Sequence, residues 1–247
     1  MQMIMVDTPG MHTPHDALGE ELNTSAIKAM EDVDVVAFLV DASKPVGTGD
    51  EWVARQVREV RGARKILVIT KADLVSKETA IQQLEAARAL GTWDDEVVLS
   101  SKNGFNVEGF VQAVAKWLPE GPKWFPEDMD TDQPFEVLVA EFIREKILRS
   151  YRDEVPHSIG VVADQMTYDR KKDMYRIFAN VYVERDSQKG IIIGKGGEAI
   201  KKVGIEARRD LEQMLGCKGF LDMQVKVKKN WRRDLNQIRR FGYGEGM

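Results

Sequence analysis

Apolar positions in the first 118 residues alternate between short continuous runs and helical stripes. Nearly unbroken apolar runs predict strands at residues 3–6, 33–40, 65–69 and 96–99, because a strand buried on both faces shows little polar alternation. Between and after them, apolar residues recur at helical spacing, which predicts helices at residues 18–30, 50–61, 77–90 and 107–118. Strands alternating with helices indicate βαβ units, so we expect an α/β fold with a parallel sheet.

The period changes in the second half of the chain. Residues 119–134 hold four of the eight prolines and five acidic residues, which is typical of an interdomain linker. Beyond it we expect, in order, a helix at 135–148, strands at 157–166 and 174–184, a glycine-rich turn opening a helical pattern, a helix at 205–215 and a strand at 220–227. The order α-β-β-α-α-β indicates a small α+β unit. We therefore expect domains at 1–118 and 135–230, followed by a basic C-terminal tail at 231–247.

The glycine-rich turn is Gly194-Lys195-Gly196-Gly197. A helix N-terminus attracts anions and glycine lets a backbone approach closely, so this stretch can hold a phosphate. Gly194, Gly196 and Ala199 also satisfy the G-x-G-x-x-A spacing of a dinucleotide-binding turn, but only one strand remains after them, too little for that fold. The GXXG loop of a KH domain, which clamps single-stranded RNA, fits the element order. A plain turn that merely starts a helix stays open.

Charge is distributed unevenly along the chain. The net charge is −4, but residues 1–133 hold 13 Lys/Arg against 23 Asp/Glu, and residues 134–247 hold 23 against 17. A basic second half favours a polyanionic partner, usually nucleic acid, over a merely solvated basic face. The single cysteine, Cys217, excludes an internal disulfide, and three scattered histidines make no convincing metal site. Neither a spanning run nor a signal peptide is recognisable, so the cytoplasm is the expected location.

Polar clusters in the first half follow the predicted strands, where a parallel sheet places its ligand crevice. The clusters are Asp7-Thr8-Pro9-Gly10, Thr70-Lys71-Ala72-Asp73 and Ser100-Ser101-Lys102. Asp7 can orient a Mg²⁺ ion, and the bare Gly10 N–H can reach a terminal phosphate. Asp73 can accept two hydrogen bonds from the N1 and N2 edge of guanine, while the Lys71 stem can lie along the purine. Backbone amides at Ser100–Lys102 can contact the guanine O6. Together the clusters predict a guanine-nucleotide site.

These motifs, in this order, resemble the Era family of bacterial GTPases, in which a translation-factor-like G domain precedes a type II KH domain. Asp7–Gly10 with Leu18-Gly19-Glu20 resembles the family's switch II region, residues 70–73 its guanine-specificity motif, and residues 135–231 its KH domain. The resemblance covers essentially the whole chain. It implies GTP hydrolysis with GTP and Mg²⁺, although no catalytic base is identified.

The resemblance also implies an RNA ligand, the single-stranded 3′ end of small-subunit ribosomal RNA, and a role in assembling that subunit. It implies a monomer in the cytoplasm and allows peripheral association with the inner face of the cell membrane. The expected RNA-binding residues are Ile193, Gly194, Lys195, Gly196, Gly197, Lys201, Lys202, Lys228, Lys229, Trp231 and Arg232. For Trp231, stacking on a base and packing against the protein remain alternatives.

Two departures from the family pattern change the expected activity. The sequence contains no G-x-x-x-x-G-K-[ST], which family members carry roughly one βαβ unit upstream of D-x-x-G. We therefore expect an N-terminally incomplete member, with Met1 as an internal or alternative start, that neither binds GTP tightly nor hydrolyses it. Thr70 stands where the family usually has Asn, whose side chain bridges the base and the phosphate loop. A threonine can replace only part of that bridge. The alternative is a nucleotide-independent RNA-binding protein with a vestigial G domain.

Overall fold

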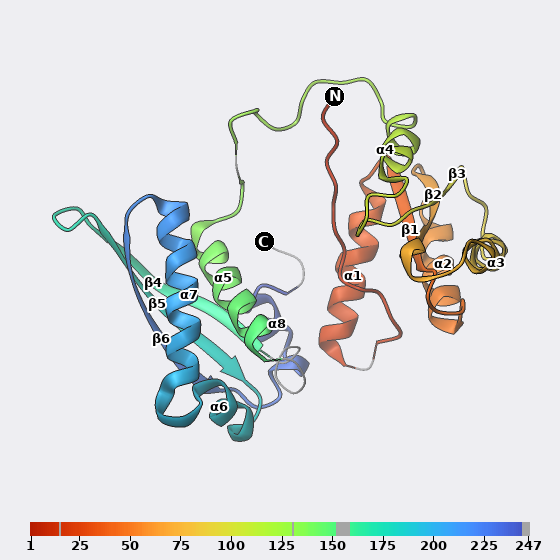
Figure 1. The fold of residues 1–247 in the computed structure, drawn as a ribbon. Coiled ribbons are helices and arrows are strands. Elements are labelled where there is room, and N and C mark those ends of the chain that lie inside the picture. Colours follow the sequence, from red (N-terminus) through yellow and green to blue (C-terminus); the bar gives the residue numbers. More distant parts are fainter. Residues whose placement is uncertain (15, 130, 152–158, 244–247) are drawn as a thin grey trace. The chain divides into compact units, whose positions relative to one another are not determined.

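The computed structural model describes all residues except 15, 130, 152–158 and 244–247 (Figure 1). The chain divides into two compact units. The first unit comprises Met1–His15 and Leu22–Asp128, and the second comprises Asp16–Glu21 and Met129–Met247. Each unit holds one three-stranded sheet. Within the described part of the chain, no helix combines the length and the apolar character needed to cross a membrane.

The first unit is built on a parallel sheet in the order β1-β2-β3, formed by β1 (Val35–Asp41), β2 (Arg64–Thr70) and β3 (Asp95–Val98). Side chains of β2 alternate between two core clusters. Leu67 and Ile69 join one cluster, and Ile66 and Val68 join the other. Both faces of β2 are therefore buried, which explains its continuous apolar run. The α/β class and three of the four predicted strands are confirmed.

Helices cover both faces of this sheet. They are α1 (Ala17–Glu31), α2 (Thr48–Glu59), α3 (Lys77–Arg88) and α4 (Val107–Ala115). Val57 of α2 and Ala87 of α3 lie in the cluster with Leu67, whereas Val114 of α4 lies in the cluster with Ile66. All four helices match the helices predicted from the apolar stripes, with boundaries shifted by a few residues.

The strand predicted at residues 3–6 is wrong. Residues 1–14 are irregular, and Ile4, Met5 and Val6 are exposed. Met3 alone of this run packs against the core, beside β2 and α4. The physical reason is that a strand exists only with a hydrogen-bonding neighbour, and no described strand pairs with this segment. An apolar run reports the tendency to be buried and does not supply the partner.

The second unit has the order α5 (Phe135–Ser150), β4 (Ile159–Asp169), β5 (Met174–Val183), α6 (Asp186–Ile193), α7 (Glu198–Leu215), β6 (Lys218–Val227). The order has the predicted form α-β-β-α-α-β, although the two helices between β5 and β6 are not the two that were predicted. The expected start of the first strand, at His157, lies outside the described residues. In the sheet, β5 pairs antiparallel with β4 and parallel with β6. Helices α5 and α7 pack on one face, where Ile143 and Leu211 meet Val181 in a single core (Figure 1).

Two helices differ from the prediction. Helix α6 was not expected, because Gly190 and three successive isoleucines are poor helix formers. Its start is fixed by Gln188, whose Oε1 accepts the backbone N–H groups of Glu184 at 3.0 Å and Arg185 at 3.1 Å. Helix α7 runs unbroken from Glu198, whereas we expected a separate helix from residue 205. Gly204 in its interior faces β6, and a Cβ there would come 3.0 Å from the terminal methyl Cε of the flexible Met223 side chain.

The segment expected to be a basic tail is folded as far as residue 243. Asp234 caps α8 (Leu235–Arg240) by accepting the backbone N–H groups of Asn236 and Gln237. After the helix, the ring of Phe241 stacks on Tyr182 of β5 at 4.7 Å between centroids. The tail prediction missed this because buried apolar side chains, not the frequent basic ones, decide where the segment lies.

Gly160 of β4 lies directly beneath the Phe241 ring, and a Cβ at Gly160 would come 2.3 Å from it. We expect Gly160→Ala to lower the free energy of unfolding of the second unit by about 1–3 kcal/mol, because the buried ring must be displaced. Chemical denaturation followed by circular dichroism measures this. Gly190→Ala is the matched control: no atom lies within 4 Å of its Cβ position, and alanine is the better helix former. Equal effects of the two substitutions would contradict the packing described here.

Candidate nucleotide site and nucleic-acid interface

The three strands of the first unit run parallel, so their carboxyl ends reach the same edge of the sheet. Strand β1 ends at Asp41, β2 ends at Thr70 and β3 ends at Val98. The loop after β2 is held to the loop after β3 by a hydrogen bond from the Ala72 N–H to the Leu99 carbonyl, 3.2 Å long. The predicted clusters at residues 70–73 and 100–102 are therefore brought together.

Asp73 and Ser100 form the centre of this edge. Ser100 is fully buried, and its hydroxyl donates to Asp73 Oδ1 over 2.5 Å, while Asp73 itself is exposed. The buried serine fixes the carboxylate, whose Oδ2 has no hydrogen-bond partner recorded in the described part of the chain. A fixed, outward-facing carboxylate can accept two adjacent N–H groups, as on the N1 and N2 edge of guanine. The role of Asp73 as a base acceptor stays a prediction, and its orientation by the Ser100 side chain was not expected from the sequence.

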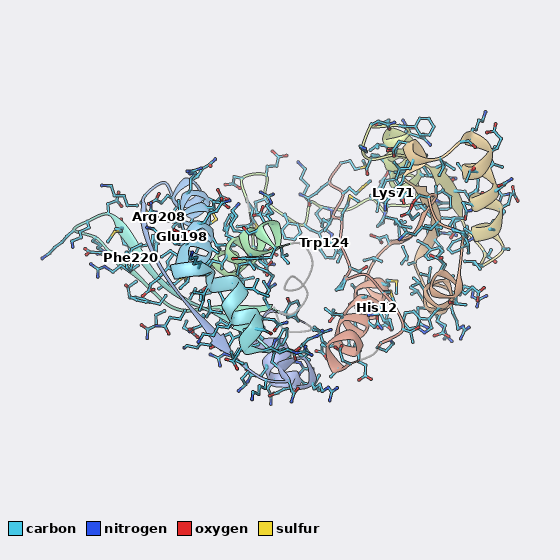
Figure 2. The ribbon with its side chains drawn as sticks, turned by 60° about the horizontal axis from the view of Figure 1, so that its bottom comes forward. His12, Lys71, Trp124, Glu198, Arg208 and Phe220 are labelled. Carbon is cyan, nitrogen blue, oxygen red and sulfur yellow. The ribbon has the colours of Figure 1, made fainter. Side chains whose placement is uncertain are left out.

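Lys71 lies beside Asp73 in the left-handed region, with φ of 56°. Its Nζ lies 2.6 Å from Asp41 Oδ2 at the end of β1, while the Lys71 side chain stays 56% exposed (Figure 2). The hydrogen bond from Lys71, with a second from Ser43, lowers the pKa of Asp41 to about 2. The ammonium is thus anchored while the aliphatic stem remains accessible to a flat ligand. Asp41 was missed from the sequence, although it follows a predicted strand just as the other clusters do.

Thr70 does not reach towards this edge. Its hydroxyl donates to the Val40 carbonyl on the neighbouring strand, 3.1 Å away. A threonine at a strand end has a carbonyl of the adjacent strand within reach, so the side chain is bound within the sheet. The partial bridging role expected of Thr70 stays a prediction. Ser101 and Lys102 are exposed in the turn after β3, which is closed by a bond from the Ser100 N–H to the Phe105 carbonyl at 2.9 Å.

Residues Asp7, Thr8, Pro9 and Gly10 lie in the irregular N-terminal segment, where Asp7 and Gly10 are exposed. The Gly10 carbonyl lies 3.2 Å from His12 Nδ1. No recorded contact joins Asp7 to the Asp73 cluster, and no group of three or more possible metal-ligating side chains occurs among the described residues. Asp73 and the Lys71 stem have the chemistry to hold a purine base, whereas the described residues do not assemble a Mg²⁺ site around Asp7.

In the second unit, Gly194-Lys195-Gly196-Gly197 joins α6 to α7. Gly194, Gly196 and Gly197 all have positive φ, at 71°, 64° and 80°, which side-chain-bearing residues rarely adopt. Gly194 is also tightly packed, since a Cβ there would come 2.5 Å from Ala199 Cβ. In contrast, no atom lies within 4 Å of the Cβ positions of Gly196 and Gly197. One glycine fixes the loop against α7, and the other two leave its backbone open to a ligand.

The open loop is flanked by cations and by apolar side chains. Lys195, Lys201 and Lys202 are exposed, while Ile193 and Ile200 are half-buried against the core of the second unit. The only acid of the first turn of α7 is Glu198 (Figure 2). Lys228 and Lys229 follow β6 and are exposed, whereas Arg232 is half-buried. This arrangement suits a phosphate backbone on the loop with bases on an apolar surface beside it.

Trp231 does not belong to this surface. The side chain is fully buried and packs against Phe241, at 5.0 Å between ring centroids, and against Tyr243, at 5.8 Å. The prediction that Trp231 stacks on RNA is therefore wrong, and the alternative of a packing anchor is confirmed. The basic residues around Trp231 in the sequence are compatible with either role. Only its contacts with Phe241 and Tyr243, ten and twelve positions later, distinguish packing from stacking on RNA.

Comparison with protein families gives two matches. A family model described as KH domain matches residues 154–232, and one described as 50S ribosome-binding GTPase matches residues 1–71. The first match contains the glycine loop, and the second ends at Lys71, within the cluster of residues 70–73.

Two solved structures resemble most of the chain. One is Aquifex aeolicus Era carrying the Y63A substitution and bound to GDP·AlF4⁻, with 34% sequence identity, a TM-score of 0.87, and coverage of 96% of this chain and 81% of that one. The other is Era in complex with MgGDPNP and nucleotides 1506–1542 of 16S ribosomal RNA, with 34% identity, a TM-score of 0.88, and coverage of 96% and 80%. Both similarities extend over both units.

The ion pair at the sheet edge yields a prediction. We expect Lys71→Met to raise the pKa of Asp41 from about 2 towards the ordinary value near 4. Because the folded-state pKa is depressed, the stabilisation exists above the unfolded-state value and is lost as pH falls through the folded value. Carboxyl ¹³C titration of Asp41 by NMR measures the shift. Lys77→Met, which removes an exposed lysine without a recorded ion pair, is the control; an unchanged Asp41 pKa in Lys71→Met would refute the pairing.

Proposed function

Because the chain belongs to the Era family of GTPases with a C-terminal KH domain, we propose that it is a GTP-responsive, RNA-binding factor in small ribosomal subunit assembly. Its second unit binds the single-stranded 3′ end of small-subunit ribosomal RNA. It acts in the cytoplasm as a monomer, with peripheral contact at the inner face of the cell membrane as a further part of the proposal. The domain boundaries proposed are 1–118, 119–134 and 135–230, with residues from 231 onward as a C-terminal extension.

The observation that carries this proposal is the loop Gly194–Gly197. Its backbone is open at Gly196 and Gly197, and lysines flank it. Backbone N–H groups can reach an RNA phosphate only where no side chain stands in the way. Nearby lysines strengthen the contact because each phosphate that they neutralise releases counterions from the RNA. One similar structure was solved with a fragment of 16S ribosomal RNA, which supports this choice of ligand.

Guanine recognition is proposed for the first unit. Asp73 accepts the N1–H and N2–H₂ donors of guanine, held in place by Ser100, and the exposed Lys71 stem covers one face of the base. GTP supplies the charge and the hydrolysable phosphate when bound, with Mg²⁺ as its expected counterion. The alternative function is RNA binding without nucleotide, by a chain whose first unit is a vestigial G domain.

A substitution in the loop tests the RNA proposal. We expect Gly196→Asp to weaken binding of the 16S rRNA fragment 1506–1542 by at least about tenfold, or about 1.4 kcal/mol, because a carboxylate is placed against phosphate. Fluorescence anisotropy measures the affinity. Gly196→Asn is the matched comparison, since it has the same size, tolerates positive φ and carries no charge. It reports the cost of a side chain on the open backbone, and the further loss of affinity in Gly196→Asp reports the carboxylate. Undiminished affinity in Gly196→Asp, with the thermal unfolding midpoint retained, would remove the loop from the mechanism.

The guanine proposal is tested by the choice of base. Xanthine offers an acceptor at C2 where guanine offers an amine, so an amide at residue 73 complements it better than a carboxylate. We expect calorimetric titrations to rank GTP above ATP and XTP for the native chain, and Asp73→Asn to reverse the order of GTP and XTP. The readout is the ranking, which does not require tight binding. Loss of all discrimination, or equal binding of ATP, would support the nucleotide-independent alternative.

A further inference from the structure

One face of the sheet in the second unit lies opposite α5 and α7, and the residues that the structure describes cover only one end of it. On β5, Ile177, Ala179 and Val181 are buried beneath α5 and α7, so the alternate side chains of the strand point to the opposite face. Phe241 covers one end of that face by stacking on Tyr182. Further along the strand, towards Met174, the face is open.

Two aromatic rings occupy this open half. Phe178 of β5 is 40% exposed and Phe220 of β6 is 47% exposed. The strands are neighbours in the sheet, and the two ring centroids lie 6.4 Å apart at an angle of 65°. Large apolar rings usually lie in the core, so an adjacent pair this exposed on an ordered sheet needs an explanation beyond the fold.

The surroundings of the pair are polar and mainly cationic. Arg176 stands opposite Phe220 in the sheet register, and Lys218 lies two positions before Phe220 on the same face of β6. Lys226 is also on this face, but opposite Tyr182 at the covered end. All three are exposed and have no ion-pair partner among the residues that the structure describes. Asp222, opposite Phe178, is the acid closest in register. Gln165 and Gln224, both exposed, add amide groups that can donate and accept hydrogen bonds.

We infer that this open sheet face binds single-stranded nucleic acid, with bases stacked on Phe178 and Phe220 and phosphates near Arg176 and Lys218. Aromatic rings on neighbouring strands with cations around them are what base stacking requires, because every base has a π face and every linkage carries a charge. Unpaired cations beside exposed rings favour a polyanion over an apolar protein surface. The site is separate from the glycine loop, which precedes α7 on the opposite side of the sheet.

The test uses the full chain and a loop variant. The probe is a fluorescein-labelled oligouridine of about 12 nucleotides, long enough to cover one such platform. In the Gly196→Asp background we expect residual, salt-sensitive binding. Adding Phe178→Ala and Phe220→Ala should weaken it about tenfold or more for each ring removed.

Replacements that keep or lose the ring separate stacking from general apolar contact. Phe220→Tyr should retain the residual affinity, and Phe220→Leu should lose it. Leu235→Ala is the matched control, because Leu235 is also an exposed apolar residue of the second unit but lies on α8. Thermal unfolding midpoints confirm that each variant is folded.

Three outcomes would overturn the inference while leaving the loop proposal intact. These are no residual binding in Gly196→Asp, residual binding that is unaffected by the two alanine substitutions, and equal losses in Leu235→Ala. Weakened capture of a protein partner by Phe178→Ala with unchanged oligouridine binding would also overturn it, and would assign the face to protein. The loop proposal fails by a different result: Gly196→Asp, with Phe178 and Phe220 unchanged, would bind the 16S fragment as tightly as the native chain.

Discussion

Positive backbone φ angles at Gly194, Gly196 and Gly197 are the constraint on which the RNA-binding unit depends. They reverse the chain between α6 and α7 within four residues, so that α7 can begin at Glu198 and pack along β6. Gly194 cannot accept a side chain because Ala199 lies against it, and Gly196 is left open. The same turn therefore fixes the helix that builds the core and exposes the backbone that meets the ligand. A residue with a Cβ would compromise one function at Gly194 and the other at Gly196.

At the sheet edge of the first unit, the positions of the site residues depend on contacts between side chains and not on glycine backbone angles. Ser100 fixes Asp73 from below, and Lys71 is tied to Asp41 across two strands. Each bond is local to a strand end, so the parallel sheet, not the loops, sets the geometry. The arrangement presents a carboxylate and an aliphatic stem to solvent. These groups have the chemistry of the proposed base-recognition surface.

Much of this organisation could be predicted from the sequence, and the errors have physical causes. The apolar runs of β1 and β2 were recognisable because burial on both faces leaves a strong signal. The same signal misled at residues 3–6, since an apolar run does not specify a neighbouring strand. Helix α6 was missed because its stability comes from packing of Ile192 and from its N-terminal hydrogen bonds, against poor intrinsic propensity.

The residues of the candidate site also divide into those that the sequence indicates and those that it does not. Asp73 and the glycine loop were found because their motifs depend on local spacing. Ser100 as the support of Asp73, Asp41 as the partner of Lys71 and the burial of Trp231 depend on contacts between distant positions, which a single sequence does not reveal.

The central claim is that the RNA backbone meets the open glycine loop. Backbone amide NMR spectra recorded during titration with the 16S rRNA fragment 1506–1542 test it most directly. The account predicts the largest chemical-shift changes at the amides of Lys195, Gly196 and Gly197, with smaller changes at Lys201 and Lys202. Saturable binding that leaves those loop amides unmoved would contradict it.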